Sequence, residues 1–302
     1  MRIAVTGSHG QLAQCLIARA QNNENLVIIA LARPDFDLAL PSSIAPALAA
    51  SRADLVINAA AYTAVDKAES EPDLAYAING AGAIAVAQAA AYLNMPVIQV
   101  STDYVFSGDK PSPYTEEDPT GPVSVYGSSK LAGEIGVRAA NPHYLIARTA
   151  WVYSEFGANF VKTMLRLAAD RDTISVVADQ FGNPTSAHDL ADGLLVAARQ
   201  MLDPAFKNWG IVHMAGTGAT SWAGLAGHVM EVSRTLGGPW ANIVGIPGAD
   251  YKTAARRPAN SRLDTQRAEQ MFGIRAPEWQ VSVASVVERL VDHFQRSSIH
   301  LK

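Results

Sequence analysis

The sequence predicts an α/β fold, in which a doubly wound parallel sheet is followed by a smaller C-terminal α/β lobe. Three observations support this prediction. Short apolar runs of strand length alternate with helical patterns in the first half, a glycine-rich turn directly follows the first run, and polar side chains stand just after several runs. Alternating strands and helices form parallel sheets, which bind ligands at the carboxyl ends of their strands.

The composition indicates an ordinary globular protein. The chain has 302 residues, of which 49% are hydrophobic and 17% are charged, and its formal net charge is -4 with a pI of about 6.0. Single hydrophobic cores stop growing near ~250 to 300 residues, so we expect two lobes. The absence of a basic excess argues against a nucleic-acid partner.

The single cysteine and the apolar runs indicate a cytoplasmic protein. Cys15 alone cannot form an internal disulfide framework, and its spacing from Leu12 and Leu16 predicts a position in a packed helix face. We recognise no signal peptide at the N-terminus. The Ala-rich run at 81–91 is interrupted by polar residues, so we expect a buried helix rather than a membrane span.

The first strand leads into a turn that suits a phosphate. Residues 1–6 form an apolar run, and Gly7, Gly10 and the small Ala13 follow it before a helical pattern begins. Gly7 allows the tight turn, Gly10 lets the backbone approach a pyrophosphate, and the helix N-terminus at Gln11 and Leu12 offers N–H groups. This arrangement is typical of the dinucleotide-binding Rossmann fold.

The end of the second strand bears on the choice of cofactor. The apolar run 26–31 is followed by Arg33 and then by Asp35 and Asp37. An arginine suits the 2′-phosphate of NADPH, whereas an acidic residue suits the 2′-hydroxyl of NADH. Because Arg33 lies closest to the strand, we expect NADPH, with NADH and a solvent-exposed role for Arg33 as alternatives.

The next two strands also end in residues suited to ligand contact. The run 54–58 precedes three alanines, Ala59 to Ala61, and then Tyr62 and Thr63, so a flat ligand could lie against the backbone there. A helix is expected over 73–93 and a strand over 96–100. That strand leads to Thr102, whose hydroxyl could donate to a substrate carbonyl or simply cap a turn.

Tyr126 and Lys130 follow a polar loop at 109–124. Their spacing of four residues places them on one face of a helix. A phenol titrates near about 10, and a neighbouring positive charge favours the phenolate, so the pair could serve as an acid or base. An ordinary surface helix would show the same spacing. The catalytic interpretation of the pair therefore depends on the upstream motifs.

The second half is less regular. We expect strands at 144–147, 174–178 and 211–214, and helices at 157–169, 188–201 and 281–294, the last packing on the second lobe. The segment 250–264 concentrates cations, which suits a diphosphate or a solvent-exposed face. We therefore expect residues 1–150 to form a dinucleotide-binding domain. Residues 151–302 would form mainly a substrate-binding lobe, with some segments returning to the first domain.

Taken together, these motifs resemble the extended short-chain dehydrogenase/reductase superfamily, and within it the dTDP-4-dehydrorhamnose reductase family. The resemblance covers nearly the whole chain and rests on residues 6–12, 58–69, 101–106, 126–134, 148–153, 179–185 and 257–261. The Tyr126 and Lys130 pair is shared by the superfamily, while 58–69 and 101–106 are more specific to the family. It implies NADPH-dependent reduction of the C4 ketone of dTDP-4-dehydro-6-deoxy-L-mannose, the last step of dTDP-L-rhamnose synthesis.

The resemblance also implies residue roles. Tyr126 would donate the proton, Lys130 would lower its pKa and bind the nicotinamide ribose, and Thr102 would polarise the carbonyl. The predicted substrate residues are Thr102, Asp103, Tyr104 and Trp151. The predicted cofactor residues are Gly7, Gly10, Gln11, Leu12, Arg33, Asp37, Leu38, Ala60, Ala61, Tyr62, Thr63, Tyr126 and Lys130.

Some features separate this family from its relatives. Some members dimerise around a divalent metal, so a homodimer is an expectation, but Cys15 stands where a metal-binding carboxylate would lie and we predict no metal there. Related dehydratases follow the threonine with an Asp-Glu pair, whereas here Tyr104 follows Asp103. A reductase of a related nucleotide keto-sugar and a non-catalytic NADP-binding regulatory subunit remain alternatives.

Overall fold

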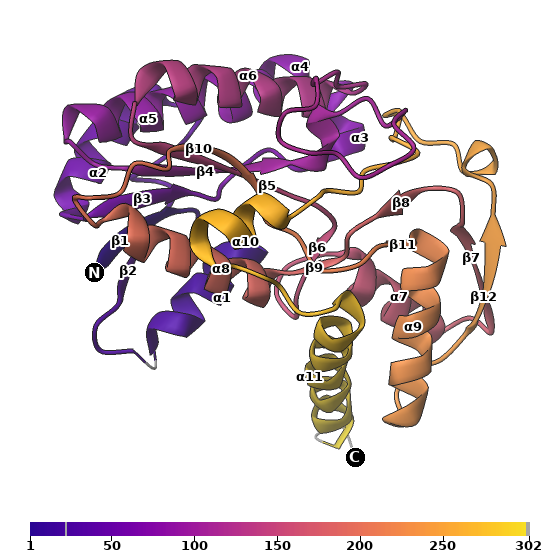
Figure 1. Cartoon of the computed structure of the whole chain (residues 1–302). Helices are drawn as coiled ribbons and strands as arrows, with labels where there is room; N and C mark the ends of the chain where they lie inside the picture. The colour runs from indigo at the N-terminus through magenta and orange to yellow at the C-terminus, as the bar shows by residue number, and fades with distance from the viewer. Residues whose placement is uncertain (22, 300–302) are drawn as a thin grey trace.

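The computed structural model describes residues 1–21 and 23–299, and its centre is a six-stranded parallel sheet (Figure 1). The strand order is β10-β5-β4-β3-β1-β2, and every pairing within the sheet is parallel. The predicted doubly wound α/β fold is therefore confirmed. The strands are β1 (Arg2–Thr6), β2 (Val27–Leu31), β3 (Leu55–Asn58), β4 (Val97–Thr102), β5 (Tyr144–Thr149) and β10 (Gly210–His213).

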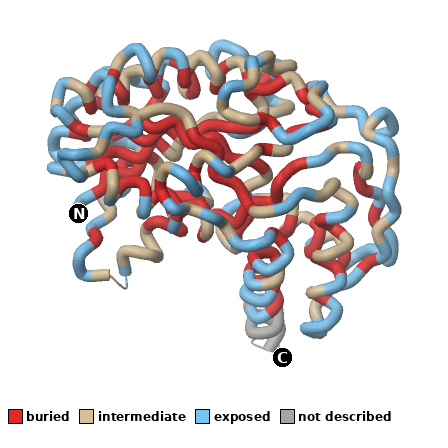
Figure 2. The backbone as a smooth tube through the Cα atoms, viewed as in Figure 1, coloured by how far each residue is buried: buried red, intermediate tan, exposed pale blue. Residues whose placement is uncertain are grey.

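Helices cover both faces of this sheet. One face carries α2 (Ile44–Ser51), α5 (Ala83–Tyr92) and α6 (Val125–Ala140), and the other carries α1 (Gln11–Gln21) and α8 (Ala187–Met201). The central strands are almost entirely buried between these layers (Figure 2). Such burial on both faces explains why these strands are continuous apolar runs without alternation.

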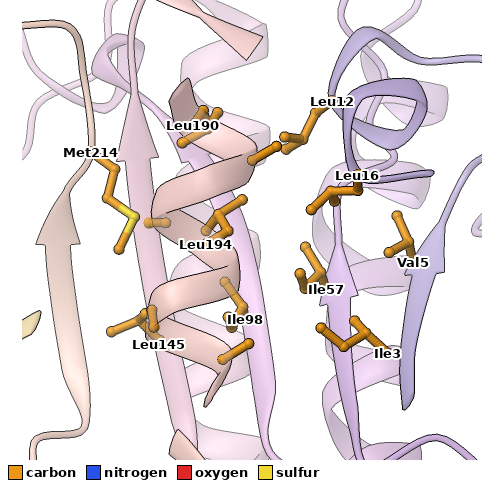
Figure 3. Packing of buried hydrophobic residues seen from close by; sticks show 14 of the residues in the cluster. Ile3, Val5, Leu12, Leu16, Ile57, Ile98, Leu145, Leu190, Leu194 and Met214 are labelled. Carbon is orange, nitrogen blue, oxygen red and sulfur yellow. The ribbon is translucent and has the colours of Figure 1, made fainter. Parts of the chain in front are cut away.

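The α1 and α8 layer holds the largest apolar cluster. Leu12 and Leu16 of α1 meet Leu190 and Leu194 of α8 above the strand residue Ile57 (Figure 3). Cys15 lies in the same cluster with no exposed surface, as its helical spacing predicts. Helix α8 and strand β10 belong to the second half of the sequence and pack on α1 and β5 of the first half.

The helix expected over 73–93 is a continuous stretch with three parts. It comprises α4 (Pro72–Tyr76), a π-helical segment (Ala77–Gly82) and α5. Pro72–Tyr92 is long and apolar enough to cross a membrane by length and composition alone, but half of its most apolar window is buried inside this fold. It thus has the character of a core helix.

Glycines in α6 allow that helix to lie close to the π-helical segment and α5. A Cβ atom on Gly133 would lie 2.2 Å from the Asn79 carbonyl oxygen, and one on Gly136 would lie 2.1 Å from Ile84 Cγ1. Neither distance is compatible with a side chain. The close approach brings the N-terminal half of α6, which carries Tyr126 and Lys130, over the carboxyl end of β4.

The second lobe has its own apolar core. It contains α7 (Phe160–Ala168), α9 (Trp222–Thr235) and α11 (Trp279–Ile299), which pack together beside a small sheet of β7 (Thr173–Val177) and β12 (Asn242–Ile246). The predicted strand at 174–178 is therefore real but lies outside the main sheet. Strand β12 and helices α2 and α9 were not predicted. Short elements complete the chain: α3 (Val65–Ala68), β6 (Val152–Tyr153), β8 (Phe181–Gly182), β9 (Thr185–Ser186), β11 (Thr220–Ser221) and α10 (Gln266–Phe272).

A buried ion pair joins α6 to the sheet. The Arg148 guanidinium on β5 donates to Glu134 on α6 through two nitrogens, Nε to Oε1 at 2.9 Å and Nη2 to Oε2 at 2.7 Å, and both side chains are 3% exposed. The guanidinium also lies over the Phe106 ring, with Cζ 5.0 Å from the ring centroid. A bidentate pair of this kind sets the distance and rotation of α6 against β5.

Replacing Glu134 with glutamine should destabilise the fold strongly, because the Arg148 charge would remain buried without its partner. We expect a loss of about 3–5 kcal/mol in the free energy of unfolding, measured by urea denaturation. Asp192→Asn is the matched control, since the exposed Arg19–Asp192 pair is also bidentate and should contribute about 0–1 kcal/mol. Equal losses in the two variants would contradict a special role for the buried pair.

Candidate active site

A cavity of about 1070 Å³ opens at the carboxyl ends of the sheet strands and reaches the second lobe. It lies where open parallel sheets bind ligands. Sixteen of the seventeen residues that the sequence analysis assigns to the site line this cavity; Tyr62 does not. The sixteen are Gly7, Gly10, Gln11, Leu12, Arg33, Asp37, Leu38, Ala60, Ala61, Thr63, Thr102, Asp103, Tyr104, Tyr126, Lys130 and Trp151.

Tyr62 points away from the cavity and has a supporting role. Its hydroxyl donates to Glu71 at 2.7 Å. Its backbone is held from both sides by the Asn79 amide, which accepts from the Tyr62 N–H at 2.8 Å and donates to the Tyr62 carbonyl at 3.0 Å. Asn79 lies in the π-helical segment, so this local irregularity presents the amide that fixes the loop at 59–63.

The phosphate turn has the expected geometry. Gly7 has φ of +86° and donates its N–H to the Leu31 carbonyl at 2.7 Å, which holds the turn against the end of β2. A Cβ atom on Gly10 would meet nothing within 4 Å, so the backbone there faces open space. The turn therefore fits a pyrophosphate, which would receive N–H groups from the start of α1.

Gln11 links this turn to the second lobe. Its side-chain oxygen accepts from the Ser154 hydroxyl at 3.0 Å and from the Asn159 amide at 2.9 Å. Asn159 also caps the N-terminus of α7 and lines the cavity. The sequence analysis assigned Gln11 to the cofactor only, and its contact with the other lobe could not be read from spacing.

Three neighbouring strands are joined by buried side chains beneath the cavity. Thr6 on β1 donates to Asn58 on β3 at 2.6 Å, and Asn58 donates to Gln99 on β4 at 2.7 Å. Thr6 also accepts the N–H of Ala60 at 2.9 Å, and Gln99 donates to the Val100 carbonyl at 2.9 Å. This chain of hydrogen bonds fixes the strand ends and the loop that follows β3.

Beside the end of β2, the cavity wall has one exposed cation, Arg33, and one carboxylate that already accepts a hydrogen bond, Asp37. Arg33 is exposed and lines the cavity, while Phe36 and Leu38 are buried beside it. Asp37 Oδ1 accepts the N–H of Ala39 at 2.9 Å, so this carboxylate stabilises its own turn. The arrangement leaves Arg33 exposed at the cavity wall, where a ribose phosphate could reach it.

Lys130 is buried at the floor of the cavity. Its Nζ donates to the Val100 carbonyl at 2.7 Å, the same oxygen that receives Gln99. Burial lowers the pKa of Lys130 to about 8, although the Glu134 carboxylate opposes this shift. Because an ammonium has three N–H donors, two remain for ligand hydroxyls.

The pKa of the Tyr126 phenol is set mainly by burial. Burial raises the pKa of Tyr126, while the neighbouring Thr102 hydroxyl lowers it and the Asp103 charge raises it further. No hydrogen bond joins Tyr126 to Lys130 within the described part of the chain, because the ammonium is held by Val100. Burial has the largest effect on the pKa of this phenol, which is protonated at neutral pH. The lowering of that pKa by Lys130, which the resemblance implies, stays a prediction.

Thr102 and Asp103 complete this polar corner. The Thr102 hydroxyl donates to Asp103 Oδ1 at 2.9 Å and accepts the N–H of Tyr104 at 3.2 Å, so its capping role is also present. Burial raises the pKa of Asp103 to about 6, against the nearby hydroxyls of Ser261 and Thr102. Among the described residues, Asp103 Oδ2 and the Ser101 and Thr149 hydroxyls are buried without a hydrogen-bond partner, although all three residues line the cavity. Such groups fit a polar ligand.

An aromatic pair forms the second-lobe wall. Trp151 has φ of +47°, unusual for a large side chain, and its ring stacks on Trp222 with centroids 3.5 Å apart. A Cβ atom on Gly182 would lie 2.4 Å from Trp151 Cε2, so only glycine fits there. The sequence analysis did not single out Trp222, since a tryptophan at the start of a helix carries no signal by itself.

The cation-rich segment 250–264 contributes one residue to the cavity. Arg257 lines it and donates through Nη2 to Asp66 on α3 at 2.9 Å, while its Nε is buried without a partner in the described structure. Arg257 therefore reaches the cavity, whereas Lys252 is exposed, and the binding of a diphosphate by this segment stays a prediction.

Comparisons with known proteins identify the family. The family model described as RmlD substrate binding domain matches residues 1–292. A curated dTDP-4-dehydrorhamnose reductase from Sinorhizobium fredii is 50% identical over 292 residues, covering 96% of this chain and 98% of that protein. The chain belongs to the dTDP-4-dehydrorhamnose reductase family. The resemblance inferred from the motifs is thereby confirmed.

Solved structures of the family have the same fold. A crystal structure of a dTDP-4-dehydrorhamnose reductase from Clostridium acetobutylicum has a TM-score of 0.89 at 35% identity, covering 96% of this chain and 99% of that chain. One from Bacillus anthracis, in complex with NADP, has a TM-score of 0.87 at 34% identity, covering 94% of this chain and 98% of that chain.

Cys15, where the sequence analysis predicts no metal, is a free and buried cysteine on α1. Burial raises the pKa of its thiol to about 12, so the sulfur stays protonated and suits neither metal binding nor nucleophilic attack. Within residues 1–21 and 23–299, no cluster of three or more His, Cys, Asp and Glu side chains is placed to hold a metal ion.

The pH dependence of NADPH binding should follow Lys130. Below pH 8 the protonated amine donates to the ribose, and above it the charge is lost, so affinity should fall as pH rises through about 8. We expect this decline in the wild type and in Tyr126→Phe, but not in Lys130→Met, when NADPH binding is measured by fluorescence titration. A decline that disappears in Tyr126→Phe would assign the titration to the phenol instead.

Proposed function

We propose that this chain catalyses the NADPH-dependent reduction of the C4 ketone of dTDP-4-dehydro-6-deoxy-L-mannose, which yields dTDP-L-rhamnose. The observation that carries the proposal is the convergence of Tyr126, Thr102 and Lys130 on one cavity, whose other end is a phosphate-binding turn. Family membership supports the same reaction, since the relatives named above are dTDP-4-dehydrorhamnose reductases.

The cofactor would lie along the sheet edge. The turn at Gly7 and Gly10 would receive the pyrophosphate, Arg33 the adenosine phosphate, and Lys130 the nicotinamide ribose. NADPH would supply the hydride that goes to C4. The complex of the Bacillus anthracis relative with NADP supports this choice, with NADH as a second cofactor to be tested.

The protein's own groups would manage the proton. Thr102 and Tyr126 would both donate hydrogen bonds to the ketone oxygen, and Tyr126 would transfer its proton as negative charge develops there. The raised pKa of Tyr126 suits reduction, because a donor must hold its proton until the alkoxide forms. The Thr102 hydroxyl has one proton, which it donates to Asp103 in this structure, so it would turn from Asp103 to the ketone oxygen when the substrate binds. Asp103, whose pKa is raised by burial to about 6, would then accept from a sugar hydroxyl.

The second lobe would bind the rest of the nucleotide sugar. Trp151 and Tyr104 line the cavity on that side. We assign cofactor binding to residues 1–150 and sugar-nucleotide binding mainly to residues 151–302, in a cytoplasmic enzyme that forms a homodimer. Size-exclusion chromatography with light scattering tests the dimer.

The geometry of the site bears on two alternative functions, a reductase of a related nucleotide keto-sugar and a regulatory subunit that only binds NADP. A related nucleotide keto-sugar would use the same three groups, so substrate competition distinguishes it. A regulatory subunit that only binds NADP would not need a buried lysine and a protonated phenol in one cavity, and the presence of both favours the enzyme.

Replacing Tyr126 with phenylalanine should remove the proton donor while leaving the cofactor site intact. We expect kcat to fall by a factor of about 10²–10⁴, which is the contribution of a positioned general acid. The affinity for NADPH should change by less than about threefold, because the phenol's main role is in the proton transfer. NADPH oxidation followed by absorbance on adding the keto-sugar nucleotide measures the rate. Turnover equal to the wild type would remove Tyr126 from the mechanism, and absence of turnover in the wild type would favour the regulatory alternative.

A further inference from the structure

Ser261 is a buried hydroxyl that the proposed reaction does not use. It lies in the segment 250–264 and is 3% exposed, and its Oγ accepts the indole Nε1–H of Trp151 at 3.2 Å. Burial raises the pKa of Asp103 to about 6, and hydrogen bonding to the Ser261 hydroxyl opposes this shift. One side chain therefore meets both the aromatic wall of the second lobe and the polar corner of the cavity.

The backbone around Ser261 is held on both sides. Its N–H donates to the Phe181 carbonyl at 2.8 Å, and the Phe181 N–H donates to the Ala259 carbonyl at 2.9 Å. The neighbouring Asn260 donates through Nδ2 to the Ser112 carbonyl at 2.8 Å, which ties the same segment to the first half of the chain. These bonds fix the position of the Ser261 oxygen and leave its hydroxyl proton free to rotate.

The Ser261 hydroxyl has one proton for two acceptors. In this structure the hydroxyl donates to the Phe181 carbonyl at 3.3 Å, a long contact to an oxygen that already receives the Ser261 N–H. In the same arrangement Asp103 Oδ2 is buried and has no hydrogen-bond partner among the described residues. Because a hydrogen bond to a carboxylate is stronger than one to a neutral carbonyl, the proton favours Asp103 when that group is ionised.

The Trp151 indole depends on Ser261 for its orientation. Its backbone is in the left-handed region, its face stacks on Trp222, and Gly182 leaves room for its edge. Stacking sets the distance between two rings but does not fix the rotation of a ring in its own plane. The directional bond from Nε1 to Ser261 does fix that rotation.

We propose that Ser261 is a positioning residue that ties the Trp151 indole to the Asp103 carboxylate, so that the wall and the acceptor expected to contact the sugar keep one fixed separation. The proposal rests on the proposed function, since it concerns the sugar site of that reaction. Ser261 itself would touch neither the sugar nor the cofactor.

Asp103 is the group at this corner that titrates near pH 6. Burial raises the pKa of Tyr104 to about 12 and also raises that of Tyr126, while it lowers the pKa of Lys130 to about 8. The Arg257 guanidinium, which also lines the cavity, carries a constant charge. A change with a midpoint near pH 6 at this corner therefore reports Asp103.

The first test follows the Trp151 indole N–H by ¹H–¹⁵N NMR in the full chain labelled at tryptophan, from pH 5 to pH 7.5 and with no sugar nucleotide. The resonance is the one that Trp151→Phe removes. It should shift with a midpoint near pH 6 in the wild type, and this titration should be absent in Ser261→Ala and in Asp103→Asn. The other indole resonances of each variant show that it is folded. A titration that persists in either variant would overturn the proposal.

The second test measures the pH dependence of kcat/KM for the keto-sugar nucleotide. Ser261→Ala removes a bond that favours the ionised form of Asp103, so the pKa of that group rises further. The acidic limb of the profile should therefore move to higher pH by about one unit, roughly the effect of one hydrogen bond to a charged group. A purely structural role would lower the whole profile without moving this limb.

Ser282→Ala is the matched control, because Ser282 is also buried and donates to an aspartate, Asp189, which lines a separate small pocket. Its acidic limb should coincide with that of the wild type. A limb that stays in place in Ser261→Ala, or moves equally in both variants, would overturn the proposal and leave the reductase function intact. The indole titration in a wild type that shows no turnover would support the link between Trp151 and Asp103 and overturn the proposed reaction.

Discussion

The hydrogen-bonded chain through Thr6, Asn58 and Gln99 is the constraint on which the site depends. Parallel strands all end at one edge, and these buried side chains bind three neighbouring ends to one another. The chain continues through the Val100 carbonyl to Lys130, and from Thr6 to the backbone of Ala60. The phosphate turn, the loop after β3 and the lysine are therefore parts of one rigid polar layer beneath the cavity.

Burial and neighbouring charges set the protonation states of the groups in the cavity. Burial acts on neighbouring groups in opposite directions, raising the pKa of Tyr126 and Asp103 and lowering that of Lys130, because it disfavours whichever form is charged. A protonated phenol in the same cavity as a lysine whose pKa burial lowers to about 8 suits a site that delivers a proton. The buried pair of Glu134 and Arg148 holds the helix that carries both groups, so electrostatics also set their position.

The predictions of individual strands and helix faces succeeded where burial alone shaped the sequence pattern. The central strands β3 and β4 are almost entirely buried and so appear as continuous apolar runs. Cys15 follows the helical spacing of the core. The prediction for β7 placed the strand correctly along the chain, but no local signal says which sheet a strand joins. Strand β12 was missed because exposed residues alternate irregularly along it. Trp222 and Asn159 enter the cavity only through the packing of α9 and α7, which spacing along the chain does not encode.

The sequence by itself determined the strands of the main sheet, the phosphate turn, and the residue types of the site, because each depends on contacts between residues a few positions apart. Tertiary structure alone decided what those residues do. The Tyr62 hydroxyl donates to Glu71, the Lys130 ammonium donates to the Val100 carbonyl, and Gln11 accepts from Ser154 in the second half of the chain. These outcomes depend on burial and on partners distant in the chain, and both arise only when the sheet and its helices are assembled.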